Sequence, residues 1–186
     1  MNEEIHINNE NLKEQILSDL PLKYRPIRKS DLESLRKLSI HYTDLNDLQF
    51  LKYCKKLKYL SFLQMDTSLR PFHTLPVLPE LKMLSITYVD IPDLEFLSNC
   101  PNLQRLDLAG IGTIDISPVN HLKNLKSLEI ADTNLAGCEK IDKIETLEYL
   151  ALHHLNIQHF PFHQFPNVKE FNCHEVKVED ITQCFG

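Results

Sequence analysis

Three segments share one pattern of apolar residues: PNLQRLDL at residues 101–108, KNLKSLEI at 123–130 and ETLEYLAL at 145–152. The central leucines of these segments are Leu106, Leu128 and Leu150, so the pattern returns every 22 residues. A fixed period of this length is typical of a solenoid, whose units cannot bury an apolar face alone and therefore stack on one another. The sequence thus predicts an array of short stacked repeats.

The same register extends in both directions from these segments. The central position of each copy is occupied by Leu38, Leu60, Leu84, Leu106, Leu128, Leu150 and Phe171. Only the step from Leu60 to Leu84, of 24 residues, and the step from Leu150 to Phe171, of 21 residues, differ from 22. The surrounding pattern L-x-x-L-x-x-L-x-L holds apolar residues in all seven copies. This regularity predicts one continuous core along the array.

These phrases, together with Asp115, Ile116, Ser117 and Pro118, resemble the leucine-rich repeat family, in the short-repeat class of internalins and a phosphatase regulatory subunit. The resemblance covers residues 32–181. It implies an α/β fold, a right-handed solenoid curved like a horseshoe, with a parallel β-sheet on its concave face. The family's usual row of Asn is replaced by Thr43, Met65, Val89, Ile111, Thr133, Leu155 and Val176. Without those amides we expect looser and less uniform turns.

Residues 1–31 precede the repeats, which occupy residues 32–186. Ile5 and Ile7 alternate as in a short strand, and residues 11–20 carry apolar side chains at helical spacing. Because the first repeat would otherwise expose its core, this segment is expected to form an N-terminal cap. Ser30 and Glu33 have the spacing of a capping box at the start of the first repeat's helix.

Composition limits the function and the location. The chain has 186 residues and a net charge of −6, which argues against nucleic-acid binding. No apolar run reaches the roughly 18 residues that span a bilayer, and the N-terminus is too polar for a signal peptide, so a cytosolic location is expected. The five cysteines are interpreted as small core residues without disulfides.

Side chains between the inward-facing leucines should line the concave face. Acidic residues outnumber basic ones there by eight to three, with four tyrosines among them. The chain is therefore predicted to bind a basic protein partner through this face, as a monomer or a weak dimer. The candidate partner-binding residues are Tyr42, Asp44, Tyr59, Asp66, Tyr88, Asp90, Arg105, Asp107, Glu129, Asp132, Tyr149 and His153.

Three alternatives stay open. The polar face can serve solubility alone, and a binding face can belong to an inhibitor or immunity protein. Histidines gather near the C-terminus, and the register places His153 beside His174, which allows a metal site or an enzyme. Because the pair lacks an assigned third ligand and no catalytic motif is present, we expect no metal, no cofactor and no enzymatic activity.

Overall fold

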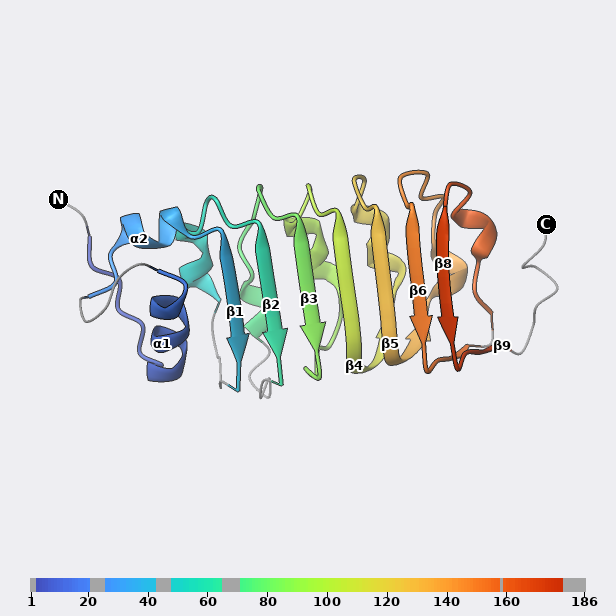
Figure 1. Ribbon diagram of the computed structural model, residues 1–186, viewed down its shortest axis with the longest axis horizontal. Coiled ribbons are helices and arrows are strands. Elements are labelled where there is room, and N and C mark those ends of the chain that lie inside the picture. Colours follow the sequence, from blue (N-terminus) through green and yellow to red (C-terminus); the bar gives the residue numbers. More distant parts are fainter. Residues whose placement is uncertain (1–2, 21–25, 43–47, 65–70, 158, 179–186) are drawn as a thin grey trace.

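The computed structural model describes residues 3–20, 26–42, 48–64, 71–157 and 159–178. Its dominant element is a seven-stranded parallel sheet, in which each strand pairs with the strand of the next repeat (Figure 1). The strands are β1 Lys37–His41, β2 Tyr59–Leu63, β3 Met83–Thr87, β4 Arg105–Asp115, β5 Ser127–Ala136, β6 Tyr149–His153 and β8 Glu170–His174. The predicted leucine-rich repeat solenoid is thereby confirmed.

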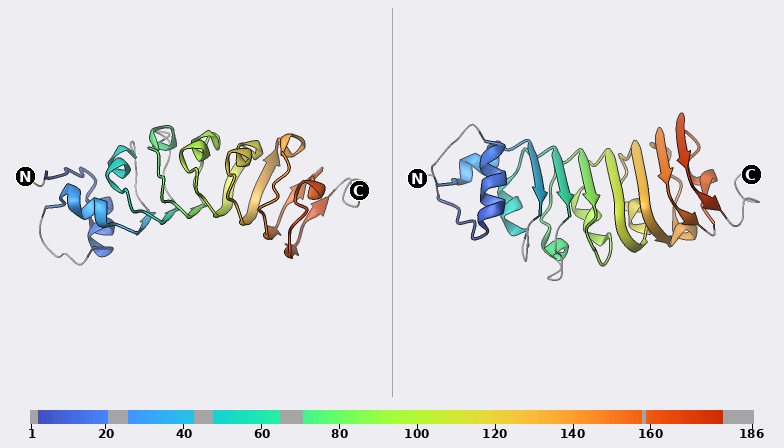
Figure 2. Two further views of the ribbon diagram at one scale, coloured as in Figure 1. Left: turned by 90° about the horizontal axis from the view of Figure 1, so that it is seen from above. Right: turned by 60° about the horizontal axis from the view of Figure 1, so that its bottom comes forward.

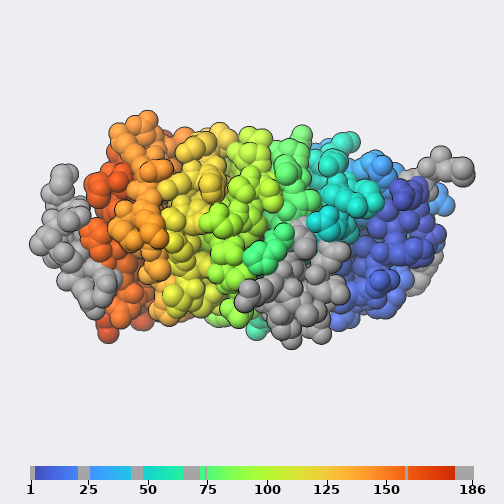
Figure 3. Space-filling model, turned by 180° about the vertical axis from the view of Figure 1, so that it is seen from behind, coloured from blue at the N-terminus to red at the C-terminus, as the bar shows by residue number. Residues whose placement is uncertain are grey.

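Short helices lie behind the sheet, one in each connection between strands (Figure 2). These 3₁₀ helices are η1 Gln49–Tyr53, η2 Pro71–Thr74, η3 Glu95–Asn99, η4 Ser117–His121, η5 Cys138–Lys140 and η6 Phe162–Gln164. Figure 3 shows this helix-bearing face, on which successive repeats form adjacent bands from one end of the molecule to the other. No helix among the described residues has the length and apolarity that crossing a membrane requires.

The strand register follows the predicted repeat register, including its two irregular steps. Leu60 pairs with Leu84 across the 24-residue step, and Leu150 pairs with Phe171 across the 21-residue step. In the first six repeats all four positions of the apolar pattern are buried. In the seventh, Phe165 is buried and Val168 is half-buried, whereas Phe171 and Cys173 are exposed. The interpretation of Cys173 as a core residue is therefore wrong, because no described repeat covers β8; Cys184 lies outside the described residues.

The described part of each repeat shares one backbone feature, at the position that follows the five paired strand residues. The expectation of looser turns stays a prediction, because residues 43–47 and 65–70 lie outside the described residues. One position per repeat has a positive φ between 48° and 61°: Tyr42, Gln64, Tyr88, Gly110, Asp132, His154 and Glu175. The row without Asn is a buried apolar row at Val89, Ile111 and Leu155. Asparagines elsewhere link the repeats instead, since the side-chain amides of Asn102 and Asn124 donate to the carbonyls of Pro79 and Pro101 at 2.9 and 3.1 Å.

The N-terminal segment contains two helices, α1 Glu10–Ser18 and α2 Lys29–Ser34. Helix α1 buries Leu12 and Ile16 and lies against β1. Ile5 does not lie in a strand: its side chain packs against the core, and its N–H donates to the Ile27 carbonyl at 2.8 Å beside an isolated antiparallel bridge. Helix α2 begins one residue before Ser30, and the Asp31 carboxylate accepts the Arg28 N–H at 2.8 Å, so the predicted Ser30–Glu33 capping box is wrong.

A second, smaller sheet joins the turns after the last two strands. It consists of β7 Asn156–Ile157 and β9 Lys177–Val178, which pair in parallel. The two repeats are thus paired both before and after the two turns that contain His154 and Glu175.

Candidate interaction surface

The outward side of the seven-stranded sheet, here called the strand face, corresponds to the predicted concave face. Along β1 and β3 every second residue is buried and the intervening residues are half-buried or exposed. Because the strands are parallel and in register, equivalent residues form rows across the repeats. The first row is Lys37, Tyr59, Met83, Arg105, Ser127, Tyr149 and Glu170.

The first three repeats present aromatic and hydroxyl side chains on this face. Tyr42 is 64% exposed, Tyr59 48% and Tyr88 55%, and Leu63 lies beside them. A row of serines runs between the row that contains Tyr59 and the row that contains Leu63, and in it the Ser39 and Ser61 hydroxyls are 2.7 Å apart. A surface of tyrosine and serine combines rigid contact area with adaptable hydrogen bonding, as antibody paratopes do.

Neighbouring groups hold two of these tyrosines in place. The Tyr42 ring meets the His41 ring edge-on, with 5.6 Å between ring centroids. The Tyr88 ring lies so close over Gly110 that a Cβ atom added there would collide with it. Less freedom is therefore lost when a partner immobilises these rings than if they were fully mobile.

A hollow of about 420 Å³ adjoins Tyr42 at the end of the sheet. Its walls include His41 from β1 and Asn11 and Gln15 from α1. The Gln15 side chain bonds the backbone of His41 twice, donating to the carbonyl at 2.7 Å and accepting the N–H at 3.0 Å. The strand face thus continues past β1 onto α1.

The middle of the strand face carries a charge cluster instead of unopposed acidic residues. Arg105 donates to the Asp107 carboxylate at 2.9 Å and to Glu129 at 3.1 Å. The hydrogen bond to Asp107 raises the pKa of Arg105, while burial raises the pKa of Asp107 against the opposing effect of Arg105. Three of the predicted binding residues are therefore brought together and partly neutralise one another, which the rows alone did not reveal.

The remaining predicted residues are dispersed. Asp90 is exposed after the end of β3, Asp132 is exposed within β5, and His153 is half-buried on β6. Tyr149 is half-buried, and its hydroxyl accepts a hydrogen bond from the Asn172 amide at 3.0 Å. Asp44 and Asp66 lie outside the described residues.

A histidine cluster at the C-terminal end differs from the pair that the register suggested. His153 does pair with His174 along the strands. The imidazole that contacts His174 is nevertheless His154, with ring centroids 5.3 Å apart, and its Nδ1 lies 2.9 Å from Oε2 of Glu175. The sequence signal for this group was present, since His154 and Glu175 occupy the same row, but alternation alone favoured His153.

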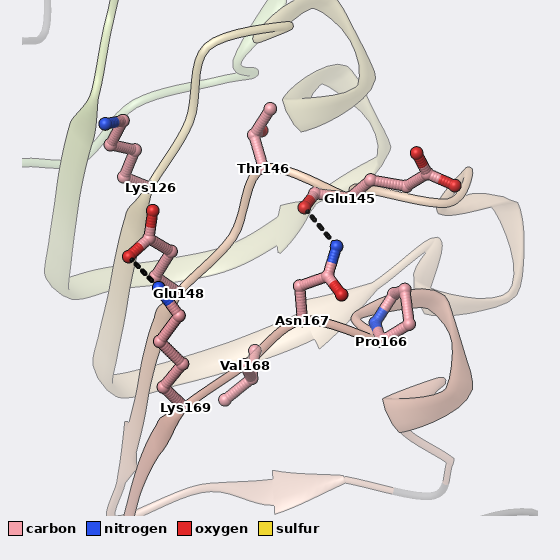
Figure 4. A pocket seen from close by; sticks show the side chains of 8 residues that line it. All are labelled: Lys126, Glu145, Thr146, Glu148, Pro166, Asn167, Val168 and Lys169. Atoms are coloured by element: carbon pink, nitrogen blue, oxygen red, sulfur yellow. Dashed lines mark hydrogen bonds and ion pairs between the residues drawn. The ribbon is translucent and has the colours of Figure 1, made fainter.

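A shallow hollow of about 520 Å³ is lined by the residues that lead into β6 and β8 (Figure 4). Its charged groups bind one another, because Lys169 Nζ lies 2.8 Å from the Glu148 carboxylate. The Asn167 amide donates to the Glu145 carbonyl at 2.8 Å, which repeats the Asn102 and Asn124 links. These contacts serve the stacking of the repeats and leave few polar groups aimed at a ligand.

Buried thiols confirm most of the cysteine interpretation. Cys54, Cys100 and Cys138 are buried and free. Burial raises the pKa of the Cys54 and Cys100 thiols to about 12, and that of Cys138 to about 11. Since the thiolate is the reactive form, these three side chains act as small apolar residues.

Comparison with solved structures places the fold. Internalin C2 of Listeria monocytogenes superposes with a TM-score of 0.76 at 18% identity, over 94% of this chain and 78% of that one. The internalin InlF of the same species gives a TM-score of 0.69 at 19% identity, over 99% of this chain and 62% of that one. No protein-family model and no curated protein sequence matches. The chain is therefore a leucine-rich-repeat solenoid with an internalin-like fold.

Proposed function

We propose that the chain is a non-enzymatic protein-binding module whose contact centre is the strand face of the first three repeats. One observation carries the proposal. Among the described residues, six large apolar or aromatic side chains are exposed, and four of them are Tyr42, Tyr59, Leu63 and Tyr88. A concentration of this kind on one face is typical of a site that another protein covers.

The dimensions of the face suit a protein. With strands about 4.8 Å apart, seven strands present a surface on the order of 30 Å long. A standard interface removes about 800 Å² per partner, which such a surface can supply. The aromatic repeats would form the dry centre, and the serine and threonine hydroxyls between them would supply the directional hydrogen bonds.

Charge supports a basic partner through association rate more than through affinity. Arg105 offsets Asp107 and Glu129, so the acidic excess rests on residues farther along the face, such as Asp132, Glu170 and Glu175. A field of one sign steers an oppositely charged protein toward the face, and salt screens it within about 8 Å at physiological ionic strength. The aromatic centre then determines how long the complex lasts.

Photo-crosslinking in an extract of the native cells tests the site. A benzophenone amino acid is placed at Tyr59 or Tyr42 in one set of variants, and at Val77, which is 56% exposed, as the matched control. We expect one protein to be crosslinked from the tyrosine positions and not from Val77. The double variant Tyr59→Ala/Tyr88→Ala should weaken its capture at least about tenfold, as hot-spot residues do.

The outcomes separate the parts of the proposal. Release of the captured protein as salt rises supports the basic partner, whereas an acidic or salt-insensitive protein keeps the site and rejects the electrostatic part. Equal crosslinking from Val77 and Tyr59, or capture unaffected by the double variant, would show that the strand face is not the contact.

A further inference from the structure

Three potential metal ligands lie close together at the C-terminal ends of β6 and β8. They are His154, which follows β6, His174, the last residue of β8, and Glu175, which follows β8. One ligand atom from each lies within 4.8 Å of the others, and all three side chains are exposed. The shortest separation, 2.9 Å, joins Nδ1 of His154 and Oε2 of Glu175.

The backbone fixes this arrangement. His154 and Glu175 occupy the same position in consecutive repeats, with φ of 53° and 54°. The His154 N–H donates to the His174 carbonyl at 2.9 Å, so the two turns are directly hydrogen-bonded. The β7–β9 pair holds the chain on the far side of both turns. Neither turn can move away from the other without breaking these bonds, which limits the entropy lost when the three ligands gather around an ion.

We propose that His154, His174 and Glu175 bind a divalent transition metal ion of the zinc type. Imidazole and carboxylate together suit Zn²⁺ and Ni²⁺, and a three-ligand site leaves a fourth position for water or for a partner's side chain. Two ligands about 2.1 Å from zinc at a tetrahedral angle lie about 3.4 Å apart, so the His154–Glu175 pair, now 2.9 Å apart, needs only a small opening. Rotation of the exposed His174 ring completes the set.

The position of the site indicates what the ion does. All five residues of β8 are exposed, and within the seven-stranded sheet of the described residues β8 is an edge strand that pairs with β6. An ion shared by His154 on one repeat and His174 on the next ties this terminal repeat to the array. An ion that binds only the folded state raises the free energy of unfolding, and this gain increases as the ion concentration rises above the dissociation constant.

Metal titration of the tag-free full chain tests the site. Isothermal titration with ZnCl₂ and, separately, NiCl₂ should show saturable binding of one ion per chain and a rise in thermal stability. The variants His154→Ala, His174→Ala and Glu175→Gln should each lower affinity at least about tenfold, because each removes one of three ligands. CaCl₂ should not bind, since calcium requires six or more oxygen ligands.

Two control variants make the result decisive. His163→Ala removes an exposed histidine on η6 and should bind zinc as the unaltered chain does. His153→Ala, next to the site, should also retain binding. Loss of affinity in His153→Ala but not in His154→Ala would overturn the assignment in favour of the register pair. Absence of saturable binding, or binding that survives all three ligand variants, would overturn the site altogether.

Discussion

At the scale of single residues, the position after the five paired strand residues of each repeat has a left-handed backbone that most side chains resist. Among the residues that the structure describes, six other than glycine adopt it, and Gly110 adopts it with φ of 61°. The left-handed conformation costs a residue with a Cβ atom roughly 1–2 kcal/mol, and glycine avoids that cost. The array tolerates the strain because the turn N–H continues the ladder between repeats, as where Tyr88 donates to the Ala109 carbonyl at 2.8 Å.

Replacing Gly110 by alanine should therefore destabilise the chain by about 2–3 kcal/mol, through backbone strain and contact with the Tyr88 ring. Gly112→Ala is the matched control, because Gly112 also has a positive φ, of 79°, but an added Cβ atom there would have no neighbour within 4 Å. It should cost only about 1–2 kcal/mol. Urea unfolding of both variants measures the difference, and equal losses would contradict a role for the Tyr88 contact.

The repeat period predicted which side chains share a row, but not how their atoms meet. It placed Arg105, Asp107 and Glu129 on one face correctly. Their mutual ion pairs depend on side-chain rotamers, which periodicity does not encode. His154 was passed over as a candidate ligand for a related reason, since the register pairs His153 with His174, whereas the contact between the His154 and His174 rings depends on their side-chain conformations.

At the scale of elements, an aspartate side chain accepts a backbone hydrogen bond at the start of two of the helices behind the sheet. The Asp115 carboxylate accepts the Ser117 N–H at 2.9 Å just before η4, and Asp93 accepts the Glu95 N–H at 3.0 Å just before η3. The Asp-Ile-Ser-Pro resemblance thus has a physical basis, because a side-chain acceptor replaces the missing partner at the start of the helix.

Asp115→Ala should lower stability by about 1 kcal/mol near neutral pH through this lost cap, with little added by the exposed ion pair to Lys140. Hydrogen bonds from Ser117, then Lys140, lower the pKa of Asp115 below its ordinary value of 3.8. A lowered folded-state pKa stabilises the protein above the ordinary value and loses that effect as pH falls through the lowered one.

The difference between Asp115→Ala and the unaltered chain should consequently shrink below about pH 4. Urea unfolding across that range, with Asp142→Ala at an exposed loop position as control, measures it. A difference that stays constant as the pH falls would show that packing, rather than the charged cap, is the cause.

The family pattern predicted the secondary-structure elements better than the hydrogen bonds and packing contacts that link one repeat to the next. Its missing asparagines led to the expectation of loose turns, and the same row is buried and apolar at Val89 and Ile111. Asparagines at a different position, Asn102 and Asn124, supply the links between repeats. A single sequence shows that an amide is absent from one row but does not show which other row compensates.

At the scale of the whole molecule, stability is set by nearest neighbours, and the two ends differ. The pattern predicted the interior repeats because each has a neighbour on both sides. It misjudged Cys173 and Phe171, because their burial depends on whether another repeat covers the last strand rather than on their own repeat. At the opposite end α1 covers β1, which supports the proposal that residues 1–31 act as a cap.

The cap proposal has its sharpest test at Gln15, whose amide bonds both backbone groups of His41 in place of a preceding strand. Gln15→Ala removes two hydrogen bonds worth about 1 kcal/mol each and should destabilise the chain by about 1–3 kcal/mol. Since each repeat senses mainly its neighbours, amide hydrogen exchange should accelerate in β1 and leave β5 unchanged. Glu14→Ala, an exposed change on the same helix, is the control. Unaltered exchange in β1 would mean that α1 does not cap the sheet, while acceleration in every strand would mean that the array unfolds as one unit rather than from its end.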